Sequence, residues 1–337
     1  MYNLEKYNIS IPDQIKQMQK NSITVILVAH KRKEFILEAA KSVLDQTIDK
    51  SLFELVVVKN LRDPDIDQFL LNHGIKNINS NIEGLGGKLS EALAFANGSI
   101  ISFLEDDDLF LPGKLDHVLN VFSNNPSTVF YHNAALFINR AGKELMTKRS
   151  DPGFNISCMS LRKESIYNSC MGKVTNSLDL FLFCNGLDAG KTKTIYDDSI
   201  LTLYRIHDTW SNNLKWTFEE YIDSYINLPQ TLLEDLEYTR KCMKSNYVKR
   251  MLDDRSISYR IEYISALILR GKATKYNVKF SEIFLWMAYP YHLNSMKKYP
   301  LKILFVIERY GPIMIKRRIL RHFYSSDLRS KLSKLVS

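Results

Sequence analysis

The sequence predicts an α/β fold in which a mainly parallel sheet is flanked by helices and followed by a helical extension. Short apolar runs rich in β-branched residues alternate with segments whose apolar residues recur every three or four positions. This alternation is typical of right-handed βαβ units, and continuous apolar runs are typical of strands buried on both faces. The 337 residues are 45% hydrophobic and 25% charged, an ordinary composition for one or two globular domains.

The alternating pattern occupies the first part of the chain. We expect strands at 22–29, 52–58 and 100–104, and helices at 33–46, 66–71 and 88–96, the last entered through the glycine-rich segment 84–87. Ligands of such sheets bind beyond the carboxyl ends of the parallel strands. The segments that follow these ends are 29–32, 59–60 and 105–108, and they are therefore candidates for a binding site.

The pattern changes in the second part of the chain. Strands are expected at 129–132 and 134–139, with a turn at 140–143 and a less regular stretch with helices after it. After Trp216 the sequence is typical of helices interrupted by prolines. We therefore expect a first domain over 1–212 and a helical extension over 213–337.

Four consecutive acidic residues, Glu105 to Asp108, follow the third predicted strand. Adjacent carboxylates repel one another, so the cluster is unfavourable unless solvent, a helix N-terminus or a metal offsets the charge. A divalent cation held by one or two carboxylates and the phosphates of a nucleotide is one explanation. A solvated turn that leads into a helix near Pro112 is the other, and this segment alone leaves both open.

Charge and cysteine content narrow the class of protein. Residues 297–337 carry eleven basic and two acidic side chains, which accounts for the whole net charge of +9, so a nucleic-acid protein with a basic main domain is not expected. The four cysteines show no C-x-x-C spacing, and we expect reduced thiols in a cytoplasmic protein. Neither a signal peptide nor an apolar run long enough to span a bilayer is evident.

The C-terminal segment 280–337 mixes basic residues with apolar and aromatic ones. This composition suits a helix lying at an anionic membrane surface, and it predicts peripheral membrane contact. A surface helix that packs its apolar side on the main domain is the alternative.

Five segments in order resemble a family 2 glycosyltransferase with the GT-A fold. They cover roughly the first 210 residues and include a D-x-D-like segment and a Y-R-x-H-like segment. The matching segments are 22–32, 42–47, 54–60, 103–108 and 204–207 with Ser211.

The resemblance implies inverting, hexosyl-type transfer from a nucleoside-diphosphate sugar to a glycan or polyprenyl-linked acceptor, assisted by Mn²⁺ or Mg²⁺. Its implied general base is Asp179, with Asp188 in reserve. The implied metal ligands are Asp107, Asp108 and His207. The implied nucleotide-sugar contacts are His30, Arg32, Asn60, Lys88, Glu105, Asp106, Asp107 and Arg205, the last as a phosphate clamp.

Several positions depart from the family pattern and leave alternatives open. Asn60 stands where the family commonly has an aspartate that reads uracil, and it is either a base contact or a turn residue. Asp179 is either the base or a first-turn acid favoured by the helix dipole, and Leu178 precedes it where the family usually has glutamate. A polyprenyl-phosphate sugar synthase and a non-catalytic, membrane-anchored nucleotide-sugar-binding scaffold are the alternative functions.

Overall fold

The computed structural model describes residues 22–148, 155–206 and 230–269, with a few isolated positions beyond them. The chain divides into two compact units. The first runs to His207 and also contains the short segment Cys242–Ser245, and the second contains the remaining residues. The predicted domain boundary at 212–213 lies outside the described residues and stays a prediction, as does the basic segment 280–337.

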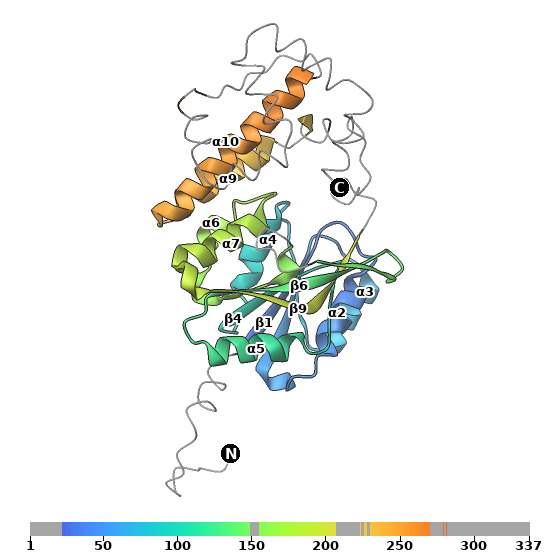
Figure 1. Cartoon of the computed structure of the whole chain (residues 1–337). Coiled ribbons are helices and arrows are strands. Elements are labelled where there is room, and N and C mark those ends of the chain that lie inside the picture. The colour runs from blue at the N-terminus through green and yellow to red at the C-terminus, as the bar shows by residue number, and fades with distance from the viewer. Residues whose placement is uncertain are drawn as a thin grey trace, which may run out of the picture. The chain divides into compact units, whose positions relative to one another are not determined.

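The described residues form a nine-stranded sheet in the order β3-β2-β1-β4-β8-β6-β9-β5, with β7 paired to β6 (Figure 1). The first four strands are parallel, as predicted, and Ile23 of β1 lies in register with Phe53 of β2 and Ile100 of β4. Their bounds are β1 Ile23–Ala29, β2 Phe53–Lys59, β3 Lys76–Asn79 and β4 Ile100–Glu105. The short edge strand β3 was not predicted.

The other half of the sheet is mixed. β8 is antiparallel to both β4 and β6, whereas β9 is parallel to β6. The bounds are β5 Leu109–Phe110, β6 Phe130–Ile138, β7 Glu144–Lys148, β8 Met159–Arg162 and β9 Thr194–Arg205. The two strands predicted at 129–132 and 134–139 are therefore the single strand β6, and β9 replaces a stretch expected to be irregular.

Helices pack on both faces of this sheet. Figure 1 shows α4, α6 and α7 over one face and α2 and α5 over the other. The bounds are α2 Ile36–Leu44, α3 Pro64–Asn72, α4 Leu85–Leu93, α5 Lys114–Asn124, α6 Asn168–Met171, α7 Leu178–Ala189, α9 Gln230–Cys242 and α10 Asn246–Leu269. α2 buries Ile36, Ala39, Ala40 and Val43, so the spacing that predicted the helix also identifies its core face.

The order of β1, β2 and β4 positions the candidate site. The chain leaves β1 toward β2 on one side and later returns to β4 on the other, so the carboxyl ends of β1 and β4 meet at a topological switch point. Ligands of open α/β sheets bind in the crevice at such a point. The segments at 29–32 and 105–108 lie there together.

Gly86 lets α4 approach the turn after α6 closely. Its backbone N–H donates to Val174 O at 3.2 Å, and a Cβ on Gly86 would lie 2.2 Å from Met171 O and 2.4 Å from Val174 O. No side chain fits there. The glycine-rich entry to α4 therefore serves helix packing at this position, and it is a poor signal for a phosphate loop.

The expectation of reduced thiols throughout is wrong for one pair. Cys170 and Cys242 form a disulfide with their Cα atoms 6.3 Å apart, and 72 residues separate them in the sequence. Cys158 and Cys184 are free and buried.

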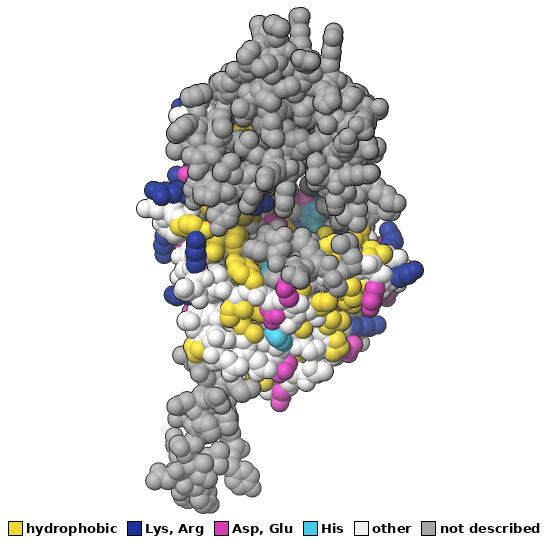
Figure 2. Space-filling model, viewed as in Figure 1, with side chains coloured by type: hydrophobic (Ala, Val, Ile, Leu, Met, Phe, Trp, Pro, Cys, Tyr) yellow, Lys and Arg dark blue, Asp and Glu magenta, His cyan; other side chains and the backbone are white. Residues whose placement is uncertain are grey.

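The described surface carries mixed side chains, and Figure 2 shows hydrophobic, acidic and basic ones interspersed on one face. Exposed large hydrophobic residues include Leu71, Phe95 and Leu145, which come from separate segments. Within the part of the chain that the structure describes, no helix is long and apolar enough to cross a membrane.

Candidate active site

The ends of β1, β2 and β4 bring most of the predicted side chains to one edge of the sheet. β1 lies between the other two strands, with Ala29 in register with Lys59 and Val28 with Glu105. The residues that follow β1 and β2, His30 and Asn60, are therefore neighbours. Lys31 has a φ of 61°, which turns the chain sharply where β1 ends.

Arg32 pairs with two of the four consecutive acids. Its Nη2 lies 2.6 Å from Asp106 Oδ1 and 2.7 Å from Asp107 Oδ2. Partial burial lowers the pKa of Arg32, but the charges of Asp106 and Asp107 outweigh this and raise it. The side chain of Arg32 is still 49% exposed, so the guanidinium can reach a ligand as well as these carboxylates.

His30, Lys88 and Asn60 form a second group beside this one. His30 Nδ1 lies 2.6 Å from Lys88 Nζ and 3.4 Å from Asn60 Nδ2. Burial lowers the pKa of His30, and the nearby Lys88 and Lys31 lower it further, so the imidazole is neutral at pH 7 and Nδ1 can accept a hydrogen bond. Asn60 Oδ1 accepts from the Lys31 N–H at 2.9 Å. The structure thus brings these three predicted residues together.

Lys88 is fully buried at the first turn of α4. Its burial lowers its pKa, while the charges of Glu83 and Asp106 oppose that shift. Lys88 therefore adds positive charge close to the acidic segment, although its ammonium contacts His30 and Glu83 O rather than solvent.

The acidic segment is electrostatically costly. Burial and the charges of Asp108, Asp107 and Asp106 raise the pKa of Glu105 well above its usual range. Burial also raises the pKa of Asp106, to about 6, in spite of its pairing with Arg32. A nearby cation would stabilise the ionised form of both groups.

Asp179 acts on the same segment. Its charge contributes to the raised pKa of Glu105, so the start of α7 lies within electrostatic reach of the end of β4. Asp179 is partly exposed, and its Oδ1 accepts from the Leu180 N–H at 2.7 Å. The predicted base is therefore close to the predicted donor site.

Asp188, the reserve base, has structural contacts instead. Its carboxylate accepts from Tyr167 OH at 2.7 Å, from the Ser245 N–H at 2.7 Å and from the Lys244 N–H at 2.9 Å. These bonds tie the end of α7 to the turn before α10. The geometry therefore favours Asp179 over Asp188.

Asp108 and Arg205 are held inside the protein. Asp108 has no exposed surface, and its two oxygens accept from the Arg205 N–H at 3.0 Å and from Asn155 Nδ2 at 2.9 Å. Burial beside Asp107 raises the pKa of Asp108 to about 7. Arg205 donates to Asp107 O, Arg140 O and Glu38 Oε2, and its guanidinium lies 4.3 Å from the Phe35 ring centroid.

These contacts disagree with two predicted roles. Three of the five N–H donors of the Arg205 guanidinium bond to protein oxygens and the side chain is only 2% exposed, so a phosphate clamp would require the side chain to move. Asp108 is likewise surrounded by donors of the protein rather than directed to a ligand. Arg205 and Asp108 position the acidic segment in this structure, and His207, the third predicted metal ligand, lies outside the described residues.

Sequence reasoning missed the residues beneath the site. Lys114 at the start of α5 is fully buried, donates to Ser157 O and Thr202 Oγ1, and has its pKa lowered by burial to about 7. Ser157 Oγ accepts from the Glu105 N–H at 3.0 Å. Lys59, at the end of β2, is buried as well and bonds to Asp67 and Asn79. No motif marks such residues, because lysine is ordinarily exposed.

The donor set fits a divalent cation of the kind expected. Asp106 and Asp107 offer carboxylate oxygens, and Mg²⁺ commonly binds one or two carboxylates together with substrate phosphates. The described residues contain no cluster of three or more His, Cys, Asp or Glu side chains arranged to hold a metal on their own. The fit therefore depends on phosphate oxygens as additional ligands.

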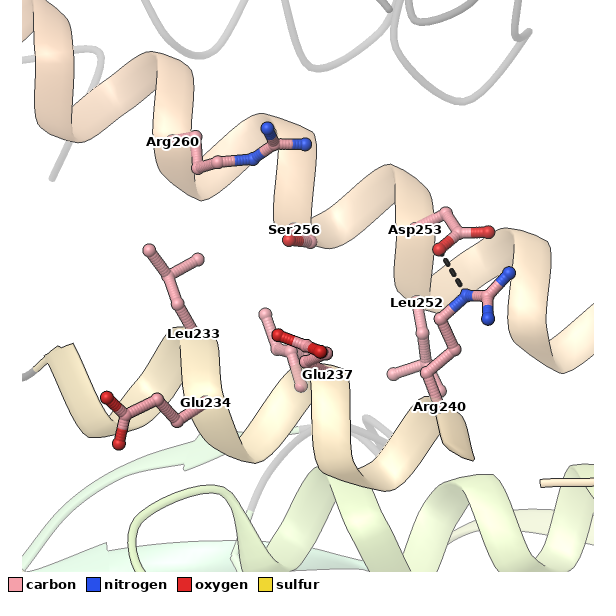
Figure 3. Close-up of a pocket in the computed structure, with 9 residues that line it drawn as sticks. Leu233, Glu234, Glu237, Arg240, Leu252, Asp253, Ser256 and Arg260 are labelled. Carbon is pink, nitrogen blue, oxygen red and sulfur yellow. Dashed lines mark hydrogen bonds and ion pairs between the residues drawn. The ribbon is translucent and has the colours of Figure 1, made fainter. Parts of the chain in front are cut away.

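A groove lies between α9 and α10. Glu234, Glu237 and Arg240 line it from α9, and Asp253, Ser256 and Arg260 from α10 (Figure 3). Arg240 pairs with Asp253, and Glu237 pairs with Lys241. None of the predicted site residues contributes to it.

Comparison with known proteins agrees with the geometry. The Glycosyl transferase family 2 model matches residues 24–174. Protein CgeD of Bacillus subtilis (strain 168) is 26% identical over 137 residues, 36% of this chain and 32% of that protein. An uncharacterised glycosyltransferase of Rickettsia bellii is 26% identical over 172 residues, which are 47% of this chain and 25% of that protein. The minor teichoic acid biosynthesis protein GgaB of B. subtilis is 26% identical over 113 residues, 32% of this chain and 12% of that protein.

Solved structures give the same fold. S. aureus TarS 1–349 in complex with UDP-GlcNAc aligns with a TM-score of 0.55 and 13% identity, over 90% of this chain and 91% of that one. Its complex with UDP aligns over the same shares with a TM-score of 0.54 and 13% identity. At such identity the likeness concerns the fold alone. The chain spans at most about a third of the curated relatives above, yet the matched segment contains the switch point with its acidic segment. Residues 24–174, which contain the switch point and the acidic segment, thus match glycosyl transferase family 2, and the fold is GT-A-like.

Proposed function

We propose that this protein transfers a sugar, with inversion, from a nucleoside-diphosphate sugar to a glycan or lipid-linked acceptor. The observation that carries the proposal is the meeting of Arg32 with Asp106 and Asp107 at the switch point, beside Lys88 and His30. Carboxylates that can bind a divalent cation lie there next to positively charged side chains that can stabilise a diphosphate. The UDP-GlcNAc named for TarS makes UDP-sugars the first donors to test, and the name of GgaB makes a teichoic acid a plausible acceptor class.

Each part of the site has a role in this reaction. Asp106 and Asp107 would hold Mn²⁺ or Mg²⁺, which when bound stabilises the negative charge of the leaving diphosphate. Arg32, half-exposed, supplies a charge-assisted contact to the same phosphates, and Lys88 adds to the positive field. Lys88 also keeps His30 neutral and fixed in orientation.

Asp179 is the proposed general base. An acceptor hydroxyl attacks the anomeric carbon on the face opposite the diphosphate, its proton passes to a carboxylate oxygen of Asp179, and the bond from carbon to the diphosphate oxygen breaks. The charge of Asp179 acts on Glu105 at the end of β4, and this electrostatic reach to the donor site supports the role. Glu105 would either contact the nucleotide or contribute to the negative potential of the acidic segment.

The first experiment is a thermal-shift screen against UDP-, GDP-, CMP- and dTDP-sugars, with and without manganese. We expect one nucleotide to stabilise the protein in a metal-dependent way, and Asp107→Asn to abolish that response. Asp45→Asn, which alters an acid at the end of α2, is the matched control and should respond as wild type. Absence of any nucleotide-dependent shift in the wild type would refute the donor site.

Residues 280–337 lie outside the described part of the chain, and their role is a proposal from composition. Eleven basic residues in the last 41 positions support peripheral contact with the anionic cytoplasmic face of a membrane. Cosedimentation with vesicles containing phosphatidylglycerol should be strong at low salt and weak with neutral vesicles. Equal binding to neutral vesicles, or none to either, would contradict this proposal.

A further inference from the structure

The turn between α9 and α10, residues Cys242–Ser245, is held within the first unit by different kinds of contact. Cys242 is bonded to Cys170 of α6, and Asp188 of α7 accepts hydrogen bonds from the Lys244 and Ser245 N–H groups. Lys244 Nζ also lies 5.3 Å from the Tyr167 ring centroid. The four residues Cys242–Ser245 belong to the first unit, although the helices on either side of them belong to the second.

The same α6 segment packs against α4, the helix that carries Lys88. Gly86 N–H donates to Val174 O, and Ser90 Oγ donates to Asn168 O at 3.3 Å. The absence of space for a Cβ at Gly86 shows that α4 and the turn after α6 are in direct backbone contact. A displacement of α6 would therefore displace the first turn of α4, and close-packed backbones do not absorb such movement locally.

Lys88 connects this contact to the donor site. It lies on the first turn of α4, two residues after Gly86, and its Nζ is 2.6 Å from His30 Nδ1. The charge of Asp106 acts on Lys88 in turn. Covalent and packed contacts thus run without interruption from Cys242 through Cys170, α6 and α4 to the residues proposed to bind the nucleotide.

The two bonded cysteines also differ from the other two in accessibility. Cys170 and Cys242 are partly exposed, whereas Cys158 and Cys184 have no exposed surface. Burial raises the pKa of Cys158 to about 12, which suppresses the thiolate needed for exchange chemistry. A small dithiol or disulfide reagent can therefore act on one pair selectively.

We propose that Cys170 and Cys242 form a reversible thiol–disulfide site that controls the affinity of the donor site. This inference rests on the proposed function, because its readout is nucleotide binding. In the reducing direction a dithiol attacks the bond, the two protein sulfurs gain two electrons and two protons, and the reductant leaves as a cyclic disulfide. Noncovalent contacts of the turn with Asp188 and Tyr167 then remain, and α6, which packs against the helix that carries Lys88, loses its covalent restraint.

The test compares nucleotide affinity in the two redox states of the full chain. UDP and UDP-GlcNAc binding with manganese would be measured by calorimetry before reduction with dithiothreitol, after it, and after reoxidation with oxidised glutathione, with the bond state verified by mass spectrometry. We expect reduction to weaken binding by about fivefold, at the lower end of typical coupling between sites. Reoxidation should restore it.

Serine variants test whether the change in nucleotide affinity arises from this cysteine pair. Cys170→Ser and Cys242→Ser should each bind as weakly as reduced wild type and should not respond to reductant. Cys184→Ala, which removes a buried thiol, should respond as wild type does. Amide exchange in 84–90 should increase on reduction, which tests the path even if a serine variant folds poorly.

The outcomes are distinguishable. If the oxidised protein binds no nucleotide with any metal, the proposed function fails before the redox question arises. If it binds nucleotide with equal affinity in both redox states and exchange in 84–90 is unchanged, the control proposed here is refuted and the bond serves stability alone. Redox-dependent binding that persists in Cys170→Ser would also overturn it.

Discussion

Replacing Gly86 by alanine should be among the most damaging single-methyl additions in this chain. The added Cβ would lie 2.2 Å from Met171 O and 2.4 Å from Val174 O, more than 1 Å inside ordinary contact, and both neighbours are backbone atoms that cannot rotate away. Relief requires α4 and the α6 turn to separate, which also breaks the Gly86 N–H bond to Val174 O.

The size of the effect follows from opposing contributions. Overpacking typically costs about 1–3 kcal/mol and a lost buried hydrogen bond about 1–3 kcal/mol, while alanine regains about 1 kcal/mol of helix propensity. We expect the free energy of unfolding to fall by about 3 kcal/mol. Urea denaturation followed by far-UV circular dichroism would measure it.

Gly172→Ala is the matched control, since it lies at the same contact from the other side. Its Cβ would meet the Ser90 side chain at 3.4 Å, an ordinary distance, and its φ of −58° suits alanine. We expect no loss of stability. If Gly86→Ala were as stable as Gly172→Ala, the backbone contact between α4 and the α6 turn would not exist as described, and the path proposed above would lose its central step.

Three further predictions test the site and its support. The pKa of Asp106 is raised from 3.8 to about 6, so the folded state binds this proton more tightly than the unfolded state does. The contribution of Asp106 to the free energy of unfolding should therefore fall by about 3 kcal/mol as the pH rises from about 4 to about 6. In metal-free urea titrations at several pH values Asp106→Asn should lose less stability over that interval, and an unchanged slope would contradict the assignment. The Arg205→Lys variant should be less stable than wild type by about 2–4 kcal/mol, because a lysine side chain cannot reach the three acceptors that Arg205 bonds to. A variant that loses nucleotide binding at an unchanged melting temperature would instead support the role of Arg205 as a phosphate clamp. Cys170→Ser should lower stability by about 4 kcal/mol from the chain entropy of a 72-residue crosslink, with no added loss in the Cys170→Ser, Cys242→Ser double variant; an additive loss would mean that the two positions act separately.

The sequence predicts the first half of the sheet well because hydrophobic periodicity determines it. β1, β2 and β4 are continuous apolar runs, and their burial on both faces requires that pattern. β9 was missed for a physical reason as well. Its register with β6 shifts twice between Asp197 and Thr202, and such an irregular segment does not show the alternation by which strands are recognised.

Residue type alone does not distinguish a ligand from a support. Arg32 follows β1 and Arg205 ends β9, and only the fold makes the first side chain half-exposed and the second buried. The disulfide could not be predicted either, since its partners are far apart in sequence and lack a motif. Asp179, expected from the resemblance to be the general base, acts electrostatically on Glu105 in the structure, and its role stays a prediction.

The four consecutive acids are incompletely compensated within the protein, and this argues for a ligand. Asp108 accepts hydrogen bonds from Asn155 Nδ2 and the Arg205 N–H, yet burial beside Asp107 still raises its pKa to about 7. Asp106 and Asp107 share the single guanidinium of Arg32, which is half-exposed and lies where a divalent cation would relieve the same repulsion. Stability alone favours complete pairing of buried carboxylates, and the raised pKa values of Glu105, Asp106 and Asp108 show that this cluster lacks it. The incomplete compensation of Asp106 and Glu105 is a cost in the free protein, and binding of a cation with a diphosphate would remove it.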